Sequence, residues 1–137
     1  MLSLLQWEKA KKSDDHQNME DNKMCFFKKK RIQRYLNGLG DSKSAFDLLL
    51  CDYLDGTLKE KFKALGLASI EIIVDCHAND FVIGAQAKYK GRYLDMQIYQ
   101  GEFSLSHDID EPDEDIFYPL ESREYFYQAL EKLIKSI

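Results

Sequence analysis

The chain has 137 residues, of which 45% are hydrophobic and 12% aromatic, and its 24 acidic and 19 basic side chains give a net charge of -5. This length allows one core of ordinary size, and the apolar content excludes a globally disordered chain. No apolar run approaches the roughly 20 residues needed to cross a bilayer, and the N-terminus lacks the order of a secretory signal peptide. We therefore expect a cytoplasmic protein with no membrane partner.

The first 23 residues differ in composition from the rest of the chain. Polar and charged side chains dominate from Lys9 to Lys23, with almost nothing apolar among them. Such a segment cannot bury enough apolar surface to fold by itself. The sequence predicts a mobile tail at 1–23 and a single α+β domain at 24–137.

Three cysteines, Cys25, Cys51 and Cys76, occur at wide spacings. An odd number at these spacings fits neither a disulfide framework nor a zinc ribbon. Each lies in an apolar context, where a free cysteine behaves as a small hydrophobic residue. We expect three unbridged thiols in a reducing compartment.

Helical spacing of apolar residues predicts three helices before residue 67. The first spans Cys25–Leu39 and carries a run of basic side chains on its remaining surface. The second begins near Ser42 or Ser44 and is interrupted at Asp55-Gly56. Thr57-Leu58-Lys59-Glu60 then has the form of a capping box, which predicts that Thr57 opens the third helix.

Apolar and polar residues alternate with a period of two between residues 68 and 107, in four runs separated by turn residues. The apolar positions are Ile70, Ile72, Val74 and Cys76; Phe81, Ile83, Ala85, Ala87 and Tyr89; Leu94, Met96 and Ile98; and Phe103, Leu105 and His107. This pattern predicts a four-stranded antiparallel meander with one covered face and one wet face.

A last helix follows, capped by Ser122. Its apolar stripe consists of Phe126, Ala129, Leu130, Leu133, Ile134 and Ile137. N-terminal helices, a β-meander and a C-terminal helix together indicate a two-layer α+β fold, because the helices must cover the apolar face of the sheet.

The segment between the meander and the last helix is strongly acidic. Six of the eight residues of Asp108–Asp115 are acidic, namely Asp108, Asp110, Glu111, Asp113, Glu114 and Asp115. Without them, 18 acidic side chains would face 19 basic ones, so this stretch carries the whole net negative charge. Charges packed this densely repel one another unless solvent, a cation or a basic partner neutralises them.

Three interpretations of the acidic stretch follow. It is a solvated loop that maintains solubility, or a weak cation site, or a surface for a basic protein partner. The EF-hand pattern fails, because its sixth position is Asp113 instead of Gly and its twelfth is Pro119 instead of Glu. Phe117 and Tyr118 follow closely, and aromatic side chains beside charges suit a protein interface. We weigh the solvated loop and the partner surface about equally, and the cation site well below both.

The sequence gives little support for nucleic-acid binding, catalysis or zinc binding. The basic run Lys28–Arg34 belongs to an acidic chain without a nucleic-acid motif, so we interpret it as a solvated helix face. In a strand, Cys76 and His77 point to opposite faces and cannot share a proton, which excludes a nucleophile pair and a zinc site there. Alternation places His107 with Phe103 and predicts a partly buried imidazole. We expect no catalytic residues, no metal, no cofactor and no nucleic-acid partner, and hence no enzyme.

Tyr93 and Tyr99 alternate with Leu94, Met96 and Ile98 and therefore face away from the covered side of the sheet. Exposed tyrosines pack well at interfaces, although ordinary cross-strand pairing would also explain them. They join the acidic residues, Phe117 and Tyr118 as candidate partner-binding residues.

The segment Tyr89–Leu133, with its acidic stretch Asp108-Ile-Asp-Glu-Pro-Asp-Glu-Asp-Ile-Phe-Tyr-Pro-Leu-Glu-Ser between a meander and a closing helix, resembles bacterial immunity proteins of contact-dependent and other polymorphic toxin systems. The resemblance is one of architecture and covers about a third of the chain. It implies an antitoxin whose acidic loop occupies the cationic site of a nuclease-type toxin domain. A small cytoplasmic adaptor or ligand-binding module is the alternative.

Overall fold

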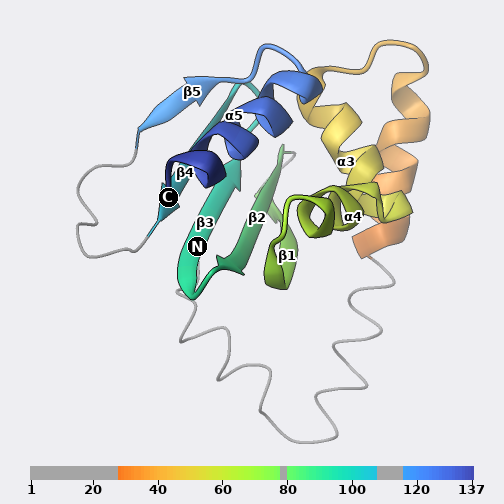
Figure 1. The fold of residues 1–137 in the computed structure, drawn as a ribbon. Helices are drawn as coiled ribbons and strands as arrows, with labels where there is room; N and C mark the ends of the chain where they lie inside the picture. The colour runs from red at the N-terminus through yellow and green to blue at the C-terminus, as the bar shows by residue number, and fades with distance from the viewer. Residues whose placement is uncertain (1–27, 78–79, 108–115) are drawn as a thin grey trace, which may run out of the picture. The chain divides into compact units, whose positions relative to one another are not determined.

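The structure is a computed structural model that describes residues 28–77, 80–107 and 116–137 (Figure 1). The chain divides into two units, Met1–Gly38 and Leu39–Ile137. Residues 28–39 are helical. Ile32 and Leu36 are buried one turn apart, whereas Lys28–Arg31 are exposed to solvent. This confirms the predicted first helix over its described part, whereas the predicted start at Cys25 and the tail at 1–23 lie outside the described residues.

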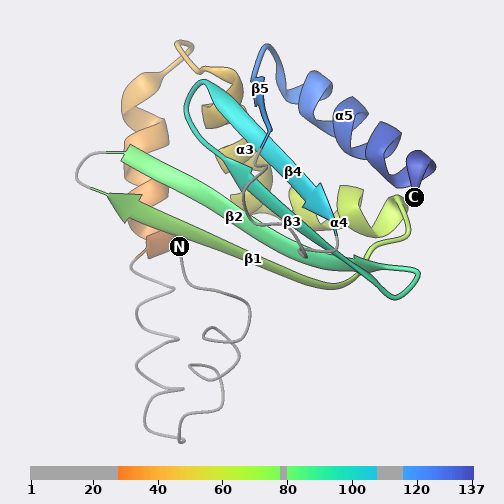
Figure 2. The same cartoon turned by 90° about the vertical axis from the view of Figure 1, so that its left-hand side faces the viewer.

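The second unit contains helix α3 (Ala45–Asp55), helix α4 (Thr57–Ala64), a sheet, and helix α5 (Arg123–Ser136). Figures 1 and 2 show all three helices on the same face of the sheet, with α5 running across β3 and β4. The described part of the chain is thus α+β, as predicted.

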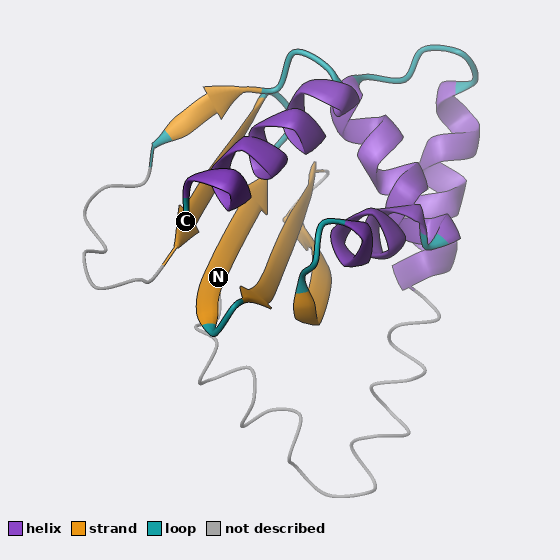
Figure 3. Ribbon diagram, viewed as in Figure 1, coloured by secondary structure: helices purple, strands orange, loops and turns teal. Residues whose placement is uncertain are grey.

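The sheet contains five antiparallel strands whose spatial order is their order in the chain (Figure 3). They are β1 (Ala68–His77), β2 (Asp80–Tyr89), β3 (Arg92–Ile98), β4 (Glu102–His107) and β5 (Phe117–Pro119). The predicted antiparallel meander is confirmed. The predicted number of four strands was wrong, because the sheet has a fifth strand, β5. β5 returns beside β4 and pairs Phe103 with Tyr118.

Local capping differs from the prediction at one helix. Ser44 caps α3 as half of a capping box, in which its Oγ accepts from Asp47 N and Asp47 Oδ2 accepts from Ser44 N. The predicted box at Thr57–Glu60 was wrong, because Gly56, with φ of 85°, is the N-cap of α4. Thr57 N donates instead to Asp55 Oδ1 at 2.8 Å.

Alternation along the strands matches the burial of their side chains. The helix-covered face buries Phe81, Ile83, Ala85, Ala87, Leu94, Met96, Ile98 and Phe103. Helix α5 lays Phe126, Leu130 and Ile134 on this face, and Ser122 caps it by accepting from Tyr125 N. The core of the second unit therefore lies between the three helices and one side of the meander.

Candidate partner-binding site

The acidic side chains predicted to bind a partner, Asp108, Asp110, Glu111, Asp113, Glu114 and Asp115, lie outside the described residues. The description resumes at Ile116, directly before β5. In the chain, β4 precedes the acidic stretch, and β5 and α5 follow it.

Strand β5 and the residue before it expose three large side chains in succession. The exposed fractions are 57% for Ile116, 45% for Phe117 and 37% for Tyr118. A single exposed apolar residue is ordinary, but three in succession on and directly before an edge strand concentrate apolar surface where a partner can reach it. Residues 116–118 are thus the most concentrated apolar surface among the described residues, where only Tyr93 is also exposed at this size.

Phe117 and Tyr118 point to opposite faces of the sheet, as neighbours in a strand must. The Tyr118 ring lies 5.6 Å from that of the buried Phe103, on the helix-covered face. The Phe117 ring lies 6.0 Å from that of Tyr99, on the opposite face. The structure therefore divides the predicted aromatic candidates between two surfaces.

Phe103 organises the first of these surfaces. Its ring centroid lies 5.6 Å from Tyr118 of β5, 5.9 Å from Tyr125 in the first turn of α5, and 5.2 Å from Phe126. The rings of Tyr125 and Phe126 meet Phe103 edge-on, which is a preferred aromatic geometry. We use the name β5–α5 corner for Tyr118 and Tyr125, which pack on Phe103, together with Glu121 and Glu124 at the start of α5.

The β5–α5 corner is acidic even without the preceding stretch. Glu121 is exposed, and the Glu124 side chain is 66% exposed in the first turn of α5. The neighbouring cation is Arg123, whose Nε lies 3.5 Å from Glu124 Oε1 and whose Nη1 lies 3.0 Å from Asp52 Oδ1. The shorter contact of Arg123 is thus with the buried Asp52, and two glutamates stand beside this one arginine at the start of α5.

Tyr93 and Tyr99 do not form one patch. Both face away from the helices, but Tyr93 lies near the start of β3 and Tyr99 directly after its end, six residues or about 20 Å further along. Tyr93 is 43% exposed, with Lys88 Nζ 4.8 Å from its ring centroid. Tyr99 is partly buried and donates its hydroxyl to Gln97 Oε1. Of the predicted pair, only Tyr99 lies beside β5.

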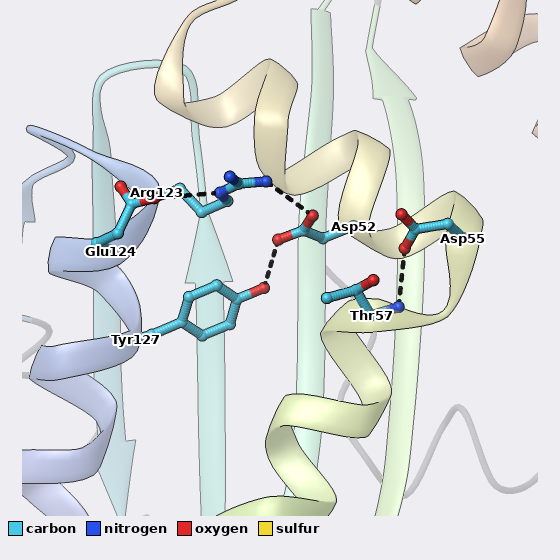
Figure 4. Close-up of polar contacts among 6 residues, drawn as sticks. All are labelled: Asp52, Asp55, Thr57, Arg123, Glu124 and Tyr127. Carbon is cyan, nitrogen blue, oxygen red and sulfur yellow. Dashed lines mark hydrogen bonds and ion pairs between the residues drawn. The ribbon is translucent and has the colours of Figure 1, made fainter.

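A polar cluster that the sequence did not reveal joins α3 to α5 (Figure 4). Asp52, which is 4% exposed, accepts from Arg123 Nη1 at 3.0 Å and from the Tyr127 hydroxyl at 2.8 Å. Burial and the bond to Asp52 raise the pKa of Tyr127 above its usual range. Burial lowers the pKa of Arg123, but the attraction of Asp52 and Glu124 outweighs it, so the pKa is raised.

This cluster fixes the start of α5 against α3 and so positions the corner. Each donor satisfies one oxygen of a carboxylate that would otherwise be costly to bury. A charged residue in a helix pattern is normally solvated, and the two donors lie 71 and 75 residues further along the chain. Only the tertiary structure brings them together.

The residues considered for catalysis or metal binding stay apart. His107 is exposed at the end of β4, so the prediction of a partly buried imidazole was wrong. Cys51 and Cys76 are not joined in a disulfide, and burial raises the pKa of Cys51, while Cys25 lies outside the described residues. Among the residues that the structure describes, no group of three or more His, Cys, Asp or Glu could hold a metal ion. No helix in the described ranges is long and apolar enough to cross a membrane.

Neither protein-family models, nor curated proteins, nor solved structures gave a match to this chain.

Proposed function

We propose that this protein is an immunity protein that binds and neutralises a cognate toxin domain with a cationic surface, in the manner of bacterial antitoxins. The observation that carries the proposal is the order of surface chemistry along the chain. Six acids at 108–115 lead directly into the exposed side chains of Ile116 and of Phe117 and Tyr118, the last two on the edge strand β5. Charge provides fast, steered association, and aromatic anchors provide slow dissociation.

A nuclease-type toxin is the partner that this chemistry suits best. Such an enzyme presents Lys and Arg side chains to the phosphates of its substrate. A dense run of carboxylates competes for the same cations, so binding and inhibition become one event. No reaction is required of the antitoxin, which is consistent with a non-enzymatic role.

Co-expression with a cationic toxin domain encoded directly upstream tests the proposal. The protein should restore growth of cells that express the toxin and should co-purify with the toxin as a stable complex. The matched control is the same protein with Asp110, Glu111, Asp113 and Glu114 replaced by Asn or Gln, which keeps the size of each side chain. Normal rescue by this variant would contradict the acidic mechanism.

An adaptor or small-ligand module remains the competing function. It would leave toxin-expressing cells unprotected while the protein folded normally. A toxin that kills equally well with and without this protein would therefore reject the immunity function outright.

A further inference from the structure

We infer that the β5–α5 corner binds one arginine or lysine side chain that projects from the partner's surface. The inference rests on the proposed function and specifies how a basic protein would be anchored. It assigns the anchor to Tyr118, Tyr125, Glu121 and Glu124, and separates it from the acidic stretch at 108–115 and from Tyr93.

The aromatic half of the corner is preorganised. Tyr118 and Tyr125 come from different elements, yet both rings pack within 6 Å of the centroid of the buried Phe103, at 5.6 and 5.9 Å. Their orientation is therefore fixed before binding, which lowers the entropic cost of an interface. Tyr118 keeps 37% of its surface exposed, and Tyr125 is partly exposed.

A cation is the ligand that completes this surface. Tyrosine rings attract guanidinium and ammonium groups that lie within about 6 Å of their centroids. The protein itself uses this contact elsewhere, where Lys61 lies 4.7 Å from the Tyr127 centroid and Lys88 lies 4.8 Å from the Tyr93 centroid. Within residues 28–77, 80–107 and 116–137, no lysine or arginine occupies the same place over Tyr118 or Tyr125.

The carboxylates of Glu121 and Glu124 flank the start of α5 and supply the countercharge. Glu124 is 66% exposed, and its contact with Arg123 is a long 3.5 Å. The shorter contact of Arg123, 3.0 Å, is with Asp52 inside the protein. An incoming guanidinium can therefore pair with Glu124 without displacing the contact that holds α5 to α3.

The partner must engage side chains, because β5 is a poor template for an added strand. Leu120 N donates to Gly101 O at 3.0 Å, so Leu120 directs its backbone polar groups toward β4. In an antiparallel pair this direction alternates from residue to residue, so the backbone polar groups of Pro119 and Phe117 point away from β4, toward the open edge. Pro119 has no N–H, and β5 has only three residues. A proline on an edge strand blocks strand addition.

The probe is an acetylated pentapeptide that alternates leucine and arginine, and its control replaces each arginine with uncharged citrulline. Amide chemical shifts of the isotope-labelled full chain are followed during titration with each peptide. The arginine peptide should shift the amides of residues 116–125 saturably, and the citrulline peptide should bind at least about fivefold more weakly. Equal shifts with both peptides would overturn the requirement for a cation.

Two pairs of variants then locate the binding site. Tyr118→Leu should weaken peptide binding at least about fivefold, whereas Tyr118→Phe, which keeps the ring, should bind within about twofold of the wild type. Glu121→Gln with Glu124→Gln should weaken binding, whereas Glu60→Gln with Glu131→Gln, which removes the same total charge elsewhere, should not. Tyr125→Leu repeats the test from α5, and urea unfolding checks that each variant is folded.

Equal weakening by both charge pairs would reduce the effect to net charge and overturn the inference. The inference is also overturned if neutralising Asp110, Glu111, Asp113 and Glu114 abolishes peptide binding while Tyr118→Leu leaves it intact. The proposed immunity function would survive that result. Conversely, a corner that binds arginine in a protein that gives no protection from toxin would refute the proposed function alone.

Discussion

The Tyr127 hydroxyl donates a 2.8 Å hydrogen bond to Asp52 Oδ2 and thereby ties α5 to α3 across 75 residues of sequence. Arg123 Nη1 binds the other carboxylate oxygen at 3.0 Å. Because α5 also carries Tyr125, the same contacts place the α5 half of the β5–α5 corner against Phe103. The buried Asp52 carboxylate therefore links the stability of α5 to the geometry of the corner that we propose as a binding site.

Tyr127→Phe should lower the free energy of unfolding by about 1 kcal/mol, because Asp52 loses one hydrogen bond at a buried oxygen. Arg123→Ala should cost more, about 1–3 kcal/mol, since it leaves the carboxylate without its cation, although partial exposure of Arg123 moderates the loss. Urea unfolding measures both. If the two losses simply add in the double variant, Asp52 does not couple them.

The raised pKa of Tyr127 predicts a dependence on alkaline pH. The folded protein holds this proton more tightly than the unfolded chain, where tyrosine titrates near pH 10. The resulting stability is complete below about pH 10 and is lost as the pH rises above it. The wild type should therefore lose more stability than Tyr127→Phe between about pH 9 and about pH 11. If the free energy of unfolding fell equally for the two proteins over this pH range, the raised pKa of Tyr127 would be contradicted.

Ser44→Ala should destabilise the protein by about 1 kcal/mol, because Ser44 Oγ accepts from Asp47 N at the start of α3. Thr57→Ala is the matched comparison, since Thr57 was expected to cap α4 but lies inside it. Its side chain bonds to Asp55, and this contact lowers the pKa of that exposed carboxyl. Thermal unfolding should show the larger loss for Ser44→Ala. The reverse order would restore the predicted cap at Thr57.

The meander and the caps at Ser44 and Ser122 could be predicted because they depend on local chemistry. Alternation of apolar residues sets which face of a strand is buried, and a serine before an apolar run satisfies the first amides of a helix. β5 escaped prediction, since three residues that include a proline give no periodic signal. His107 was misplaced because alternation implies burial only where a helix covers the strand, and β4 ends there.

The candidate site was only partly predictable. The exposed aromatics at 117 and 118 could be found from composition, but their separation onto two faces required β5 and its register with Phe103. Tyr125 was missed because, in this helix, only the residues of the apolar stripe give a periodic signal in the sequence. Its contact with Phe103 is a product of the tertiary fold.

Thiol titration of the denatured, unreduced protein should find three free cysteines. Cys51 and Cys76 are unbridged in the structure, and Cys25 is the untested third. In the native protein, burial raises the pKa of Cys51, so its alkylation should reach half of its maximal rate at a higher pH than that of a free thiol. A count of one thiol in the denatured protein would reveal a disulfide.

Neutralising Asp110, Glu111, Asp113 and Glu114 should leave monomer stability unchanged or slightly higher, because repulsion among like charges is relieved. Association with a basic partner should slow, and added salt should weaken the wild type more than the variant. Stopped-flow binding at two salt concentrations measures both effects. Unchanged rates and salt dependence would assign the stretch to solubility alone.

The five strands follow one another in space in the same order as in the chain. Each strand therefore finds its neighbour after a short search, and no parallel crossover has to close a long loop. Chains with such local contacts fold quickly for their size. The sheet can assemble progressively as it leaves the ribosome, and the β5–α5 corner forms after the meander, once α5 (Arg123–Ser136) has been synthesised.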